Sequence, residues 1–286
     1  MRLITRFAPS PTGHLHLGHA YAALTAWWRA RQAGGRFLLR LEDIDPVRCR
    51  PDYAAGIVED LAWLGVDWDG EMRVRSRHLP EYRAALDSLA ARGLVYPCFC
   101  ARADIRRKVA AAGAAPHGPD GAPYPGTCCG LSLAERWARI AAGTPYALRL
   151  DMARALEAVP GPLRFEEEGE GSVACDPARF GDAVLGRKDV PASYHLCVTH
   201  DDAAQGVTLV TRAVDLRPAT HLHRLLQALM GWPTPRYAHH RLLTDAAGRR
   251  LAKRDRAETL RDMRLRGVAP AQVREWAAIA GPPRGD

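Results

Sequence analysis

Lysine is nearly absent from this sequence of 286 residues. Only Lys108, Lys188 and Lys253 occur among 40 basic residues, so arginine carries almost all of the positive charge. The net charge is +8 and the sequence pI is near 9.4. Such a balance favours a polyanionic partner such as a nucleic acid. A GC-rich coding bias and a generally basic surface account for the same composition, so the charge alone does not define a site.

Long apolar runs are missing as well. No stretch approaches the roughly 18 consecutive apolar residues of a membrane span, and residues 1–7 hold no apolar core followed by a small-residue cleavage site. We therefore expect a soluble, cytoplasmic protein that has no membrane partner. The chain has seven cysteines, an odd number without a secretion signal, which argues against a disulfide framework. Reduced thiols or a bound metal are favoured instead.

Short apolar runs alternate with helical periodicity along the chain, which predicts an α/β fold. Strands are predicted over residues 3–8, 37–41, 146–150, 180–185, 194–199 and 208–212. Helices are predicted over 19–32, 51–64, 80–92, 132–142, 220–230, 257–265 and 269–280. The helix at 132–142 opens with a Ser132–Glu135 capping box. Strands separated by helices imply a parallel sheet. Residues 101–123 are rich in Gly, Pro and Ala and are predicted to be a loop within an inserted subdomain.

The segment SPTGHLHLGH, residues 10–19, joins the end of a strand to the start of a helix. Backbone N–H groups and the helix dipole favour phosphate at such a place. His16 and His19 are three residues apart, so both imidazoles can face one ligand, and Gly18 leaves room for a flat base or a ribose to approach the backbone. Two histidines that merely cap the helix are the alternative interpretation.

A basic loop, GRRLAKR at residues 248–254, follows a predicted strand end and turn at 242–245. Lys253 in this loop could close over phosphates and neutralise a leaving pyrophosphate. A solvated turn is the ordinary alternative.

Cysteines gather in two places within the predicted insertion. Cys98 and Cys100 are followed by Tyr124, Cys128 and Cys129. A Cys-x-Cys followed by a distant Cys is a moderate zinc signal, and three thiolates are plausible ligands. The spacing leaves the fourth ligand open among Cys129, Tyr124 and His117, and leaves open the alternative of reduced buried cysteines without a metal.

Several of these segments resemble one family. RFAPSPTGHLHLGH at residues 6–19 resembles the first signature of glutamyl-tRNA synthetases, and RLAKR at 250–254 resembles a variant of their lysine-rich second signature. RLEDIDP at 40–46, DDAAQGVT at 201–208 and RAVDL at 212–216 also match. The resemblance covers nearly the whole chain. It implies a Rossmann-like parallel sheet, interrupted by an insertion, with substrates at the carboxyl ends of the strands.

The resemblance also implies how the chain divides. The first half of the Rossmann-like domain is expected over residues 1–96, an insertion with a zinc site over 97–190, and the second half over 191–245. The signature loop and the C-terminal helices, over 246–286, complete the plan.

By resemblance, the chain activates L-glutamate with ATP and Mg²⁺. Arg6 and Arg212 are expected to contact the substrate carboxylates and Glu42 the α-ammonium, and the glutamate-binding residues together are Arg6, Phe7, Ala8, Pro9, Ser10, Glu42, Tyr194 and Arg212. The residues expected to act in catalysis are His16, His19 and Lys253, which bind ATP together with Gly18. For an isolated Glu42, a surface pair with Arg40 or Arg48 is the alternative. An arginine fork favours glutamate over glutamine.

The pattern Cys98, Cys100, Tyr124, Cys128 matches short paralogues of this family that glutamylate queuosine in tRNA(Asp). The chain also ends 32 residues after Arg254, where full glutamyl-tRNA synthetases continue into an anticodon-binding region. The resemblance therefore implies one structural Zn²⁺, held by those four residues. It further implies a monomer that transfers glutamate to the wobble queuosine of tRNA(Asp). A truncated glutamyl-tRNA synthetase acting at the tRNA 3′ end and a non-enzymatic tRNA-binding module are the rival hypotheses. Arg250, Ala252 and Ala213 depart from the family pattern.

Overall fold

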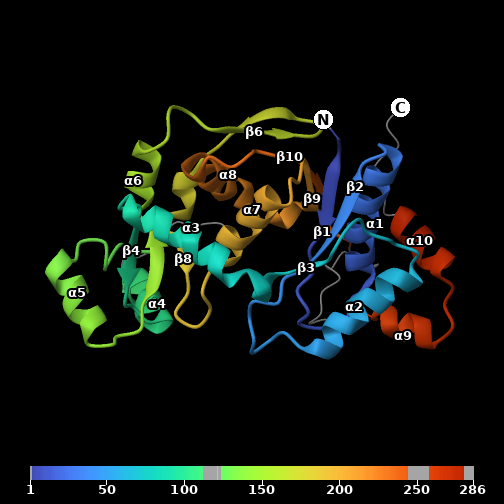
Figure 1. The fold of residues 1–286 in the computed structure, drawn as a ribbon, viewed down its shortest axis with the longest axis horizontal. Coiled ribbons are helices and arrows are strands. Elements are labelled where there is room, and N and C mark those ends of the chain that lie inside the picture. The colour runs from blue at the N-terminus through green and yellow to red at the C-terminus, as the bar shows by residue number, and fades with distance from the viewer. Residues whose placement is uncertain (1, 112–120, 122–123, 244–257, 280–286) are drawn as a thin grey trace.

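Two sheets that meet edge to edge form the central layer of the computed structural model, which describes residues 2–111, 121, 124–243 and 258–279 (Figure 1). One part contains β1 (Ile4–Phe7), β2 (Arg36–Leu41) and β3 (Arg73–Val74), in the order β1-β2-β3. The other has the order β7-β6-β10-β9, with β6 (Arg164–Glu167), β7 (Gly171–Ala174), β9 (Leu209–Ala213) and β10 (Arg236–His240). The Thr208 N–H donates to the Ile4 carbonyl oxygen at 3.0 Å, so β9 begins beside β1.

Neighbouring strands in both parts run parallel, except that β7 runs antiparallel to β6. This arrangement confirms the predicted Rossmann-like parallel sheet. Strand β2 shows why the sheet is buried on both sides, because its side chains alternate between two apolar clusters. Phe37 and Leu39 belong to one cluster, whereas Leu38 packs in another with Phe165 and Tyr237.

Helices cover the first cluster. They are α1 (Leu17–Gln32), α2 (Pro51–Trp63), α9 (Leu260–Leu265) and α10 (Pro270–Ile279), whose positions around β1 and β2 are visible in Figure 1. A further core lies between α3 (Leu79–Ala91), α7 (Tyr194–Ala204) and α8 (Ala219–Met230). Short 3-10 turns span Arg75–His78, Pro177–Phe180 and Val214–Leu216.

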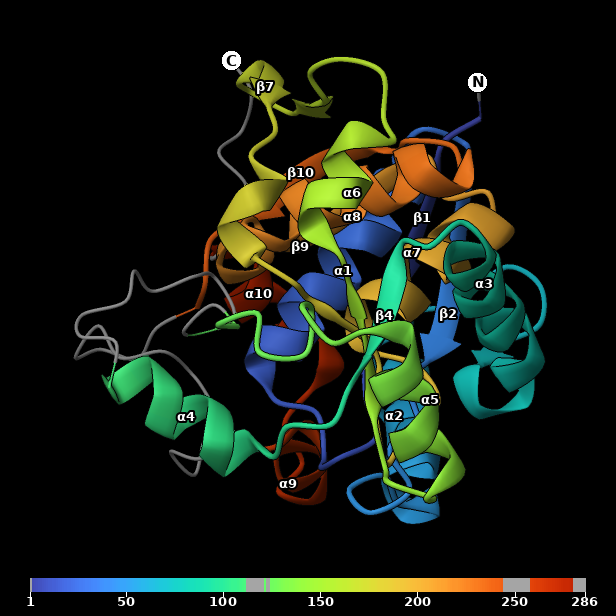
Figure 2. The same ribbon diagram turned by 90° about the vertical axis from the view of Figure 1, so that its left-hand side faces the viewer.

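The inserted region contains a small antiparallel sheet of β4 (Val95–Cys98), β5 (Ala147–Leu150) and β8 (Val184–Gly186). Its helices are α4 (Arg102–Ala111), α5 (Leu133–Ala141) and α6 (Met152–Glu157), and Figure 2 views the molecule from this side. The predicted capping box of α5 is confirmed, because Ser132 N–H donates to Glu135 Oε2 at 2.8 Å and Ser132 Oγ accepts from Glu135 N–H. Strands β6 and β7 fall within the predicted insertion yet join the main sheet through β10. The predicted domain boundaries stay a prediction.

Two sequence predictions about local structure were wrong. Residues 194–199 were predicted as a strand but form the first half of α7, whose N-cap Ser193 accepts a hydrogen bond from the Leu196 N–H. A short apolar run with Val198 and Thr199 does not by itself distinguish a buried strand from a buried helix. Residues 101–123 were predicted as a loop, but α4 occupies Arg102–Ala111.

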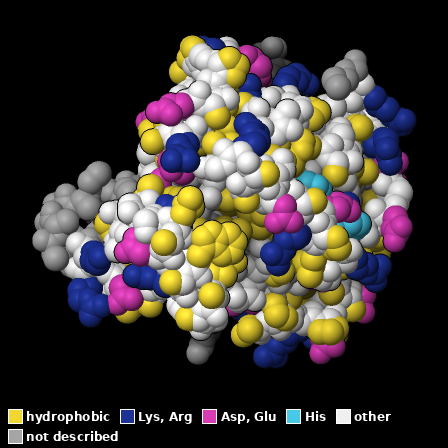
Figure 3. Space-filling view, turned by 60° about the vertical axis from the view of Figure 1, so that its left-hand side comes forward, with side chains coloured by type: hydrophobic (Ala, Val, Ile, Leu, Met, Phe, Trp, Pro, Cys, Tyr) yellow, Lys and Arg dark blue, Asp and Glu magenta, His cyan; other side chains and the backbone are white. Residues whose placement is uncertain are grey.

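The basic side chains are dispersed on the face of the molecule that Figure 3 shows. Lys and Arg side chains are spread over this face with acidic side chains among them, and hydrophobic side chains lie both near its centre and along its lower edge. Within the described ranges, we find no helix that is long and apolar enough to cross a membrane.

Candidate active site

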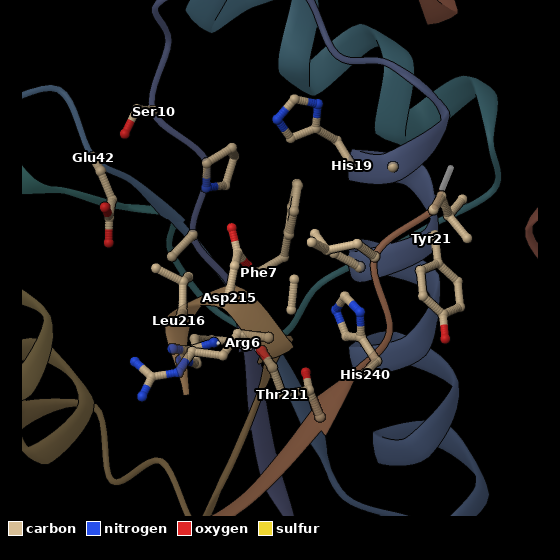
Figure 4. Close-up of a pocket in the computed structure, with 18 of the residues that line it drawn as sticks. Arg6, Phe7, Ser10, His19, Tyr21, Glu42, Thr211, Asp215, Leu216 and His240 are labelled. Carbon is tan, nitrogen blue, oxygen red and sulfur yellow. Dashed lines mark hydrogen bonds between the residues drawn. The ribbon is translucent and has the colours of Figure 1, made fainter. Parts of the chain in front are cut away.

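A cavity of about 590 Å³ lies at the carboxyl ends of β1, β2, β9 and β10. Every described residue that was predicted to bind glutamate or ATP lines it, namely Arg6, Phe7, Ala8, Pro9, Ser10, His16, Gly18, His19, Glu42, Tyr194 and Arg212. Figure 4 shows Ser10 and Glu42 on one side of the cavity and His19 and Tyr21 on the other. The structure therefore brings together residues that are up to about 200 positions apart in the sequence; the roles predicted for them stay predictions.

The two histidines of the first signature form the start of α1. His16 is the N-cap, its Nδ1 accepts from the Gly18 N–H at 3.1 Å, and the His16 N–H donates to His19 Nδ1 at 3.2 Å. The ring centroids are 3.8 Å apart. A Cβ atom added at Gly18 would lie 3.0 Å from the His16 ring, so glycine allows this close packing. Both imidazoles therefore border the cavity at the positive end of the helix dipole.

The C-terminal helices are attached to this same segment. The Leu260 N–H donates to the Leu15 carbonyl oxygen at 2.8 Å, and Thr259 forms a β-bridge with His16. Leu243, on the other side of the second signature, lines the cavity. Lys253 itself lies outside the described residues, as does His117.

Glu42 is buried at the cavity wall, where it is 8% exposed. Its Oε1 accepts a hydrogen bond from Arg75 Nη2 at 2.6 Å, and Arg75 Nε donates to Asp201 at 3.1 Å. The alternative of a surface pair is wrong, because Arg48 pairs with Asp45 and Arg40 is itself fully buried. Arg75 thus holds one oxygen of the Glu42 carboxylate, and the other can meet a ligand cation.

Asp201 and Asp202 on α7 form ion pairs with arginines of β1 and β2. Arg6 Nε donates to Asp202 Oδ1 at 3.0 Å, and Arg40 forms ion pairs with both aspartates. The Tyr82 hydroxyl donates to Asp201 at 2.8 Å. Burial acts to raise the pKa of Asp201, but hydrogen bonding and the neighbouring arginine charges outweigh it and hold that pKa below its usual value. The two aspartates therefore stay ionised and join the two halves of the site.

Arg212 is bound differently from the other buried arginines. Its Nη2 donates to Thr220 Oγ1 at 2.7 Å, and its other two hydrogen bonds go to the rings of His223 and His239, at 3.2 and 3.1 Å. Its guanidinium carbon lies 5.5 Å from the Tyr237 ring centroid. No carboxylate of the described chain pairs with it. A buried guanidinium without a carboxylate partner, at the wall of a cavity, suits an anionic ligand group.

The comparisons with known proteins agree with this arrangement. Residues 2–279 match the family described as tRNA synthetases class I (E and Q), catalytic domain. A Glutamyl-Q tRNA(Asp) synthetase of Rhodobacter capsulatus is 49% identical over 97% of this chain and 100% of the relative, and one of Nitratidesulfovibrio vulgaris is 44% identical over 96% and 85%. The chain belongs to the glutamyl-Q tRNA(Asp) synthetase family of class I tRNA synthetases. It is therefore a ligase of the aminoacyl-tRNA synthetase type.

The fold is also similar to that of a solved glutamate-tRNA synthetase. The crystal structure of the glutamate-tRNA synthetase from Elizabethkingia anophelis superposes with a TM-score of 0.76 at 28% identity, covering 89% of this chain. The chain spans 53% of the length of that structure, about half.

Outside the cavity, three cysteine side chains lie close together in the insertion of this synthetase. The sulfur atoms of Cys98, Cys100 and Cys128 lie within 4.8 Å of one another, and the Tyr124 hydroxyl is 3.3 Å from Cys98 Sγ and 3.4 Å from Cys100 Sγ. The Arg149 guanidinium stacks 3.8 Å from the Tyr124 ring centroid. Cys98, Cys100, Tyr124 and Cys128, which the family resemblance grouped as a ligand set, are thus adjacent in space, and the three thiols could hold a metal ion.

Other residues of the site were not found from the sequence. Arg75, His223 and His239 carry no motif of their own, and each acts through a partner more than ten positions away. Asp201 and Asp202 lie in the DDAAQGVT segment, so the resemblance marked them without indicating their contacts.

Proposed function

We propose that this synthetase activates L-glutamate with ATP to glutamyl-adenylate and transfers the glutamyl group to the queuosine base at the anticodon wobble position of tRNA(Asp). The observation that carries the proposal is the juxtaposition of three features in one cavity: Arg212, which no carboxylate of the described residues pairs with, the buried Glu42, and the helix start with His16 and His19. The names of the curated relatives support the same acceptor.

The amino-acid end of the cavity suits glutamate. Arg212 supplies a cation for a substrate carboxylate, and Glu42 supplies an anion for the α-ammonium. Arg6, although paired with Asp202, also lines the cavity, and Ser10 offers a hydroxyl there. Burial raises the pKa of Tyr194, which keeps its hydroxyl protonated and able to donate a hydrogen bond. Phe7, Ala8 and Pro9 form the neighbouring wall.

The nucleotide end suits ATP. The start of α1 presents backbone N–H groups, and His16, Gly18 and His19 border the cavity there. One oxygen of the glutamate carboxylate attacks the α-phosphorus, the bond to the β-phosphate bridging oxygen breaks, and pyrophosphate leaves. Mg²⁺ accompanies the triphosphate and offsets its charge. We assign Lys253 to the neutralisation of the leaving pyrophosphate, since it is the lysine of the second signature.

In the second step, a hydroxyl of the queuosine cyclopentene ring attacks the carbonyl carbon of the mixed anhydride. An ester forms, AMP leaves, and the proton of the hydroxyl passes to the released phosphate or to water. No protein nucleophile is required, since the positioning of substrates and electrostatic stabilisation carry the rate.

The cysteine cluster suits a structural zinc ion. Two sulfurs of a tetrahedral zinc site with Zn–S bonds of about 2.3 Å lie about 3.8 Å apart, and a sulfur and an oxygen ligand about 3.5 Å apart. Cys100 Sγ and Cys128 Sγ are 3.6 Å apart, close to the first value. The distances from Tyr124 Oη to the sulfurs of Cys98 and Cys100, 3.3 and 3.4 Å, are close to the second. With four protein ligands the ion would have no open position, so its contribution is to stability.

Glutamate-dependent ATP–pyrophosphate exchange without tRNA, followed by transfer of labelled glutamate to tRNA(Asp) with and without queuosine, tests this proposal. We expect exchange in the absence of tRNA and transfer only to the queuosine-containing tRNA. Labelling of unmodified tRNA at its 3′ end would instead indicate a truncated glutamyl-tRNA synthetase, a candidate favoured by the likeness to a solved glutamate-tRNA synthetase. Absence of pyrophosphate exchange would instead favour the hypothesis of a non-enzymatic tRNA-binding module.

The Lys253→Ala variant should lose exchange while it remains folded, and Lys108→Ala is the matched control because Lys108 is exposed on α4. Near-normal exchange by Lys253→Ala would contradict the role given to this lysine.

A further inference from the structure

The imidazoles that hold Arg212 have defined protonation states. Arginine has N–H donors and no acceptor, so the ring nitrogens that face its guanidinium must carry a lone pair. His223 therefore accepts through Nδ1 and His239 through Nε2. If either ring were doubly protonated, two N–H groups would point at each other. The geometry thus requires both imidazoles to be neutral.

A second contact fixes the tautomer of each ring. His239 Nδ1 lies 2.7 Å from Glu167 Oε2, so the single ring proton resides on Nδ1 and is donated to that carboxylate. His223 Nε2 lies 3.1 Å from His195 Nδ1, so the proton of His223 resides on Nε2. Burial lowers the pKa of both His223 and His239, which agrees with neutral rings. Each imidazole is therefore oriented by a hydrogen bond on the side away from Arg212, His239 by Glu167 and His223 by His195.

The charge of Arg212 is consequently left for a ligand. Arg6, Arg40 and Arg75 each contact an aspartate or a glutamate directly, whereas the acceptors of Arg212 are two neutral rings and a hydroxyl. Glu167 lies behind His239 rather than against the guanidinium. The guanidinium has five N–H donors, of which Nε uses one, Nη1 one and Nη2 one in the hydrogen bonds to His239, His223 and Thr220. One N–H remains on Nη1 and one on Nη2, and a carboxylate bound through both of its oxygens needs two donors.

We propose that His223 and His239 are positioning residues that fix Arg212 through neutral acceptors and thereby make the cavity select a substrate carboxylate over an amide. The inference rests on the proposed function, because it assigns the glutamate carboxylate to Arg212. A carboxylate in place of either imidazole would fix the guanidinium equally well but would neutralise it. Selectivity therefore depends on the lack of charge at these positions as well as on their hydrogen bonds.

Three variants of His223 separate hydrogen bonding from charge. His223→Asn keeps an acceptor near the Nδ1 position, His223→Asp puts an almost isosteric carboxylate there, and His223→Leu removes the acceptor. In glutamate-dependent pyrophosphate exchange, we expect KM for glutamate to rise by less than about threefold in the Asn variant. In the Asp and Leu variants it should rise by at least about tenfold, the effect expected for a lost charge-assisted hydrogen bond. KM for ATP should stay within about twofold throughout, which a general loss of structure would not produce.

Discrimination against glutamine provides the second measurement. The ratio of exchange with glutamate to exchange with glutamine should fall at least about tenfold from the Asn to the Asp variant, because only the charge differs between them. His221→Asn is the matched control, since His221 is on the same helix and its Nδ1 accepts from the Asp176 N–H instead. Melting temperatures identify any variant that does not fold, and the Asn and Asp pair still decides the question if the Leu variant is lost.

Equal KM values and equal discrimination in the folded Asn and Asp variants would overturn the proposal, as would a normal KM for glutamate in a folded Leu variant. These outcomes differ from failure of the proposed function. Intact exchange without transfer to queuosine-containing tRNA would refute the acceptor and leave this inference standing. If the wild-type protein shows no glutamate-dependent exchange, calorimetric titration with glutamate measures binding directly. Lack of glutamate binding would refute both the proposed function and this inference.

Discussion

Replacement of Asp201 by asparagine should cost this synthetase much of its stability. The side chain is fully buried, and it accepts hydrogen bonds from Arg73 Nε at 3.0 Å, Arg75 Nε at 3.1 Å and the Tyr82 hydroxyl at 2.8 Å. An asparagine of the same shape retains one carbonyl oxygen for Tyr82. Its NH₂ group, however, would meet guanidinium donors, and the negative charge at the centre of the network would be gone.

The magnitude follows from which partners remain. Removal of one member of a buried ion pair typically costs about 3–5 kcal/mol, because the other charge stays buried without compensation. Arg73 keeps Glu81 and Arg75 keeps Glu42 as ion-pair partners. The loss should therefore lie toward the lower end, at about 3 kcal/mol in the free energy of unfolding.

Urea unfolding followed by far-UV circular dichroism measures this difference. Asp67→Asn is the matched control, since Asp67 also pairs with an arginine, Arg31 at 3.1 Å, but its side chain is 73% exposed. A surface pair contributes about 0.2–1 kcal/mol, so the control should unfold almost as the wild type does. If Asp201→Asn lost less than about 1 kcal/mol, or no more than the control, the buried network would not hold the two halves of the site together.

Two further predictions concern acid and metal. Because the folded-state pKa values of Asp201 and Asp202 lie below their ordinary value of 3.8, the unfolded chain binds more protons in acid, and stability present near neutral pH should be lost as the pH falls from about 5 toward 2. Urea unfolding at several pH values should show a shallower loss in Asp201→Asn than in wild type, and equal slopes would contradict this account. Purified protein should contain about one zinc ion per chain. Tyr124→Phe should release it to a chelator faster than wild type or the control Tyr146→Phe, whereas protein without zinc, or with unchanged release, would argue against this ligand set.

Local features of the sequence predicted part of this site well. The start of α1 depends on neighbours a few positions apart, so residues 16–19 could be interpreted from their spacing, and the structure places His16 and His19 together at the cavity. The strand ends that carry Arg6 and Glu42 were likewise predicted from apolar runs bounded by turns.

Features decided by tertiary packing were not predictable in this way. Residues 194–199 are apolar and β-branched enough for a strand, but α7 forms because its buried face packs with α3 and α8. The partner of Glu42 is 33 positions away and that of Arg6 is 196 positions away. A surface ion pair was the natural alternative for Glu42, because sequence alone does not reveal that Arg75 is buried beside it.

The pairing of Arg6 and Arg40 with Asp201 and Asp202 has a consequence for how the protein is made. The arginines are near the N-terminus and emerge from the ribosome first, whereas their counter-charges follow at least 161 residues later, at Asp201. Until α7 has been synthesised, the β1–β2 unit cannot bury these guanidinium groups at low cost. We therefore expect the catalytic sheet to complete its folding late, once Asp201 and Asp202 have been synthesised, because these ion pairs join segments that are far apart in the sequence.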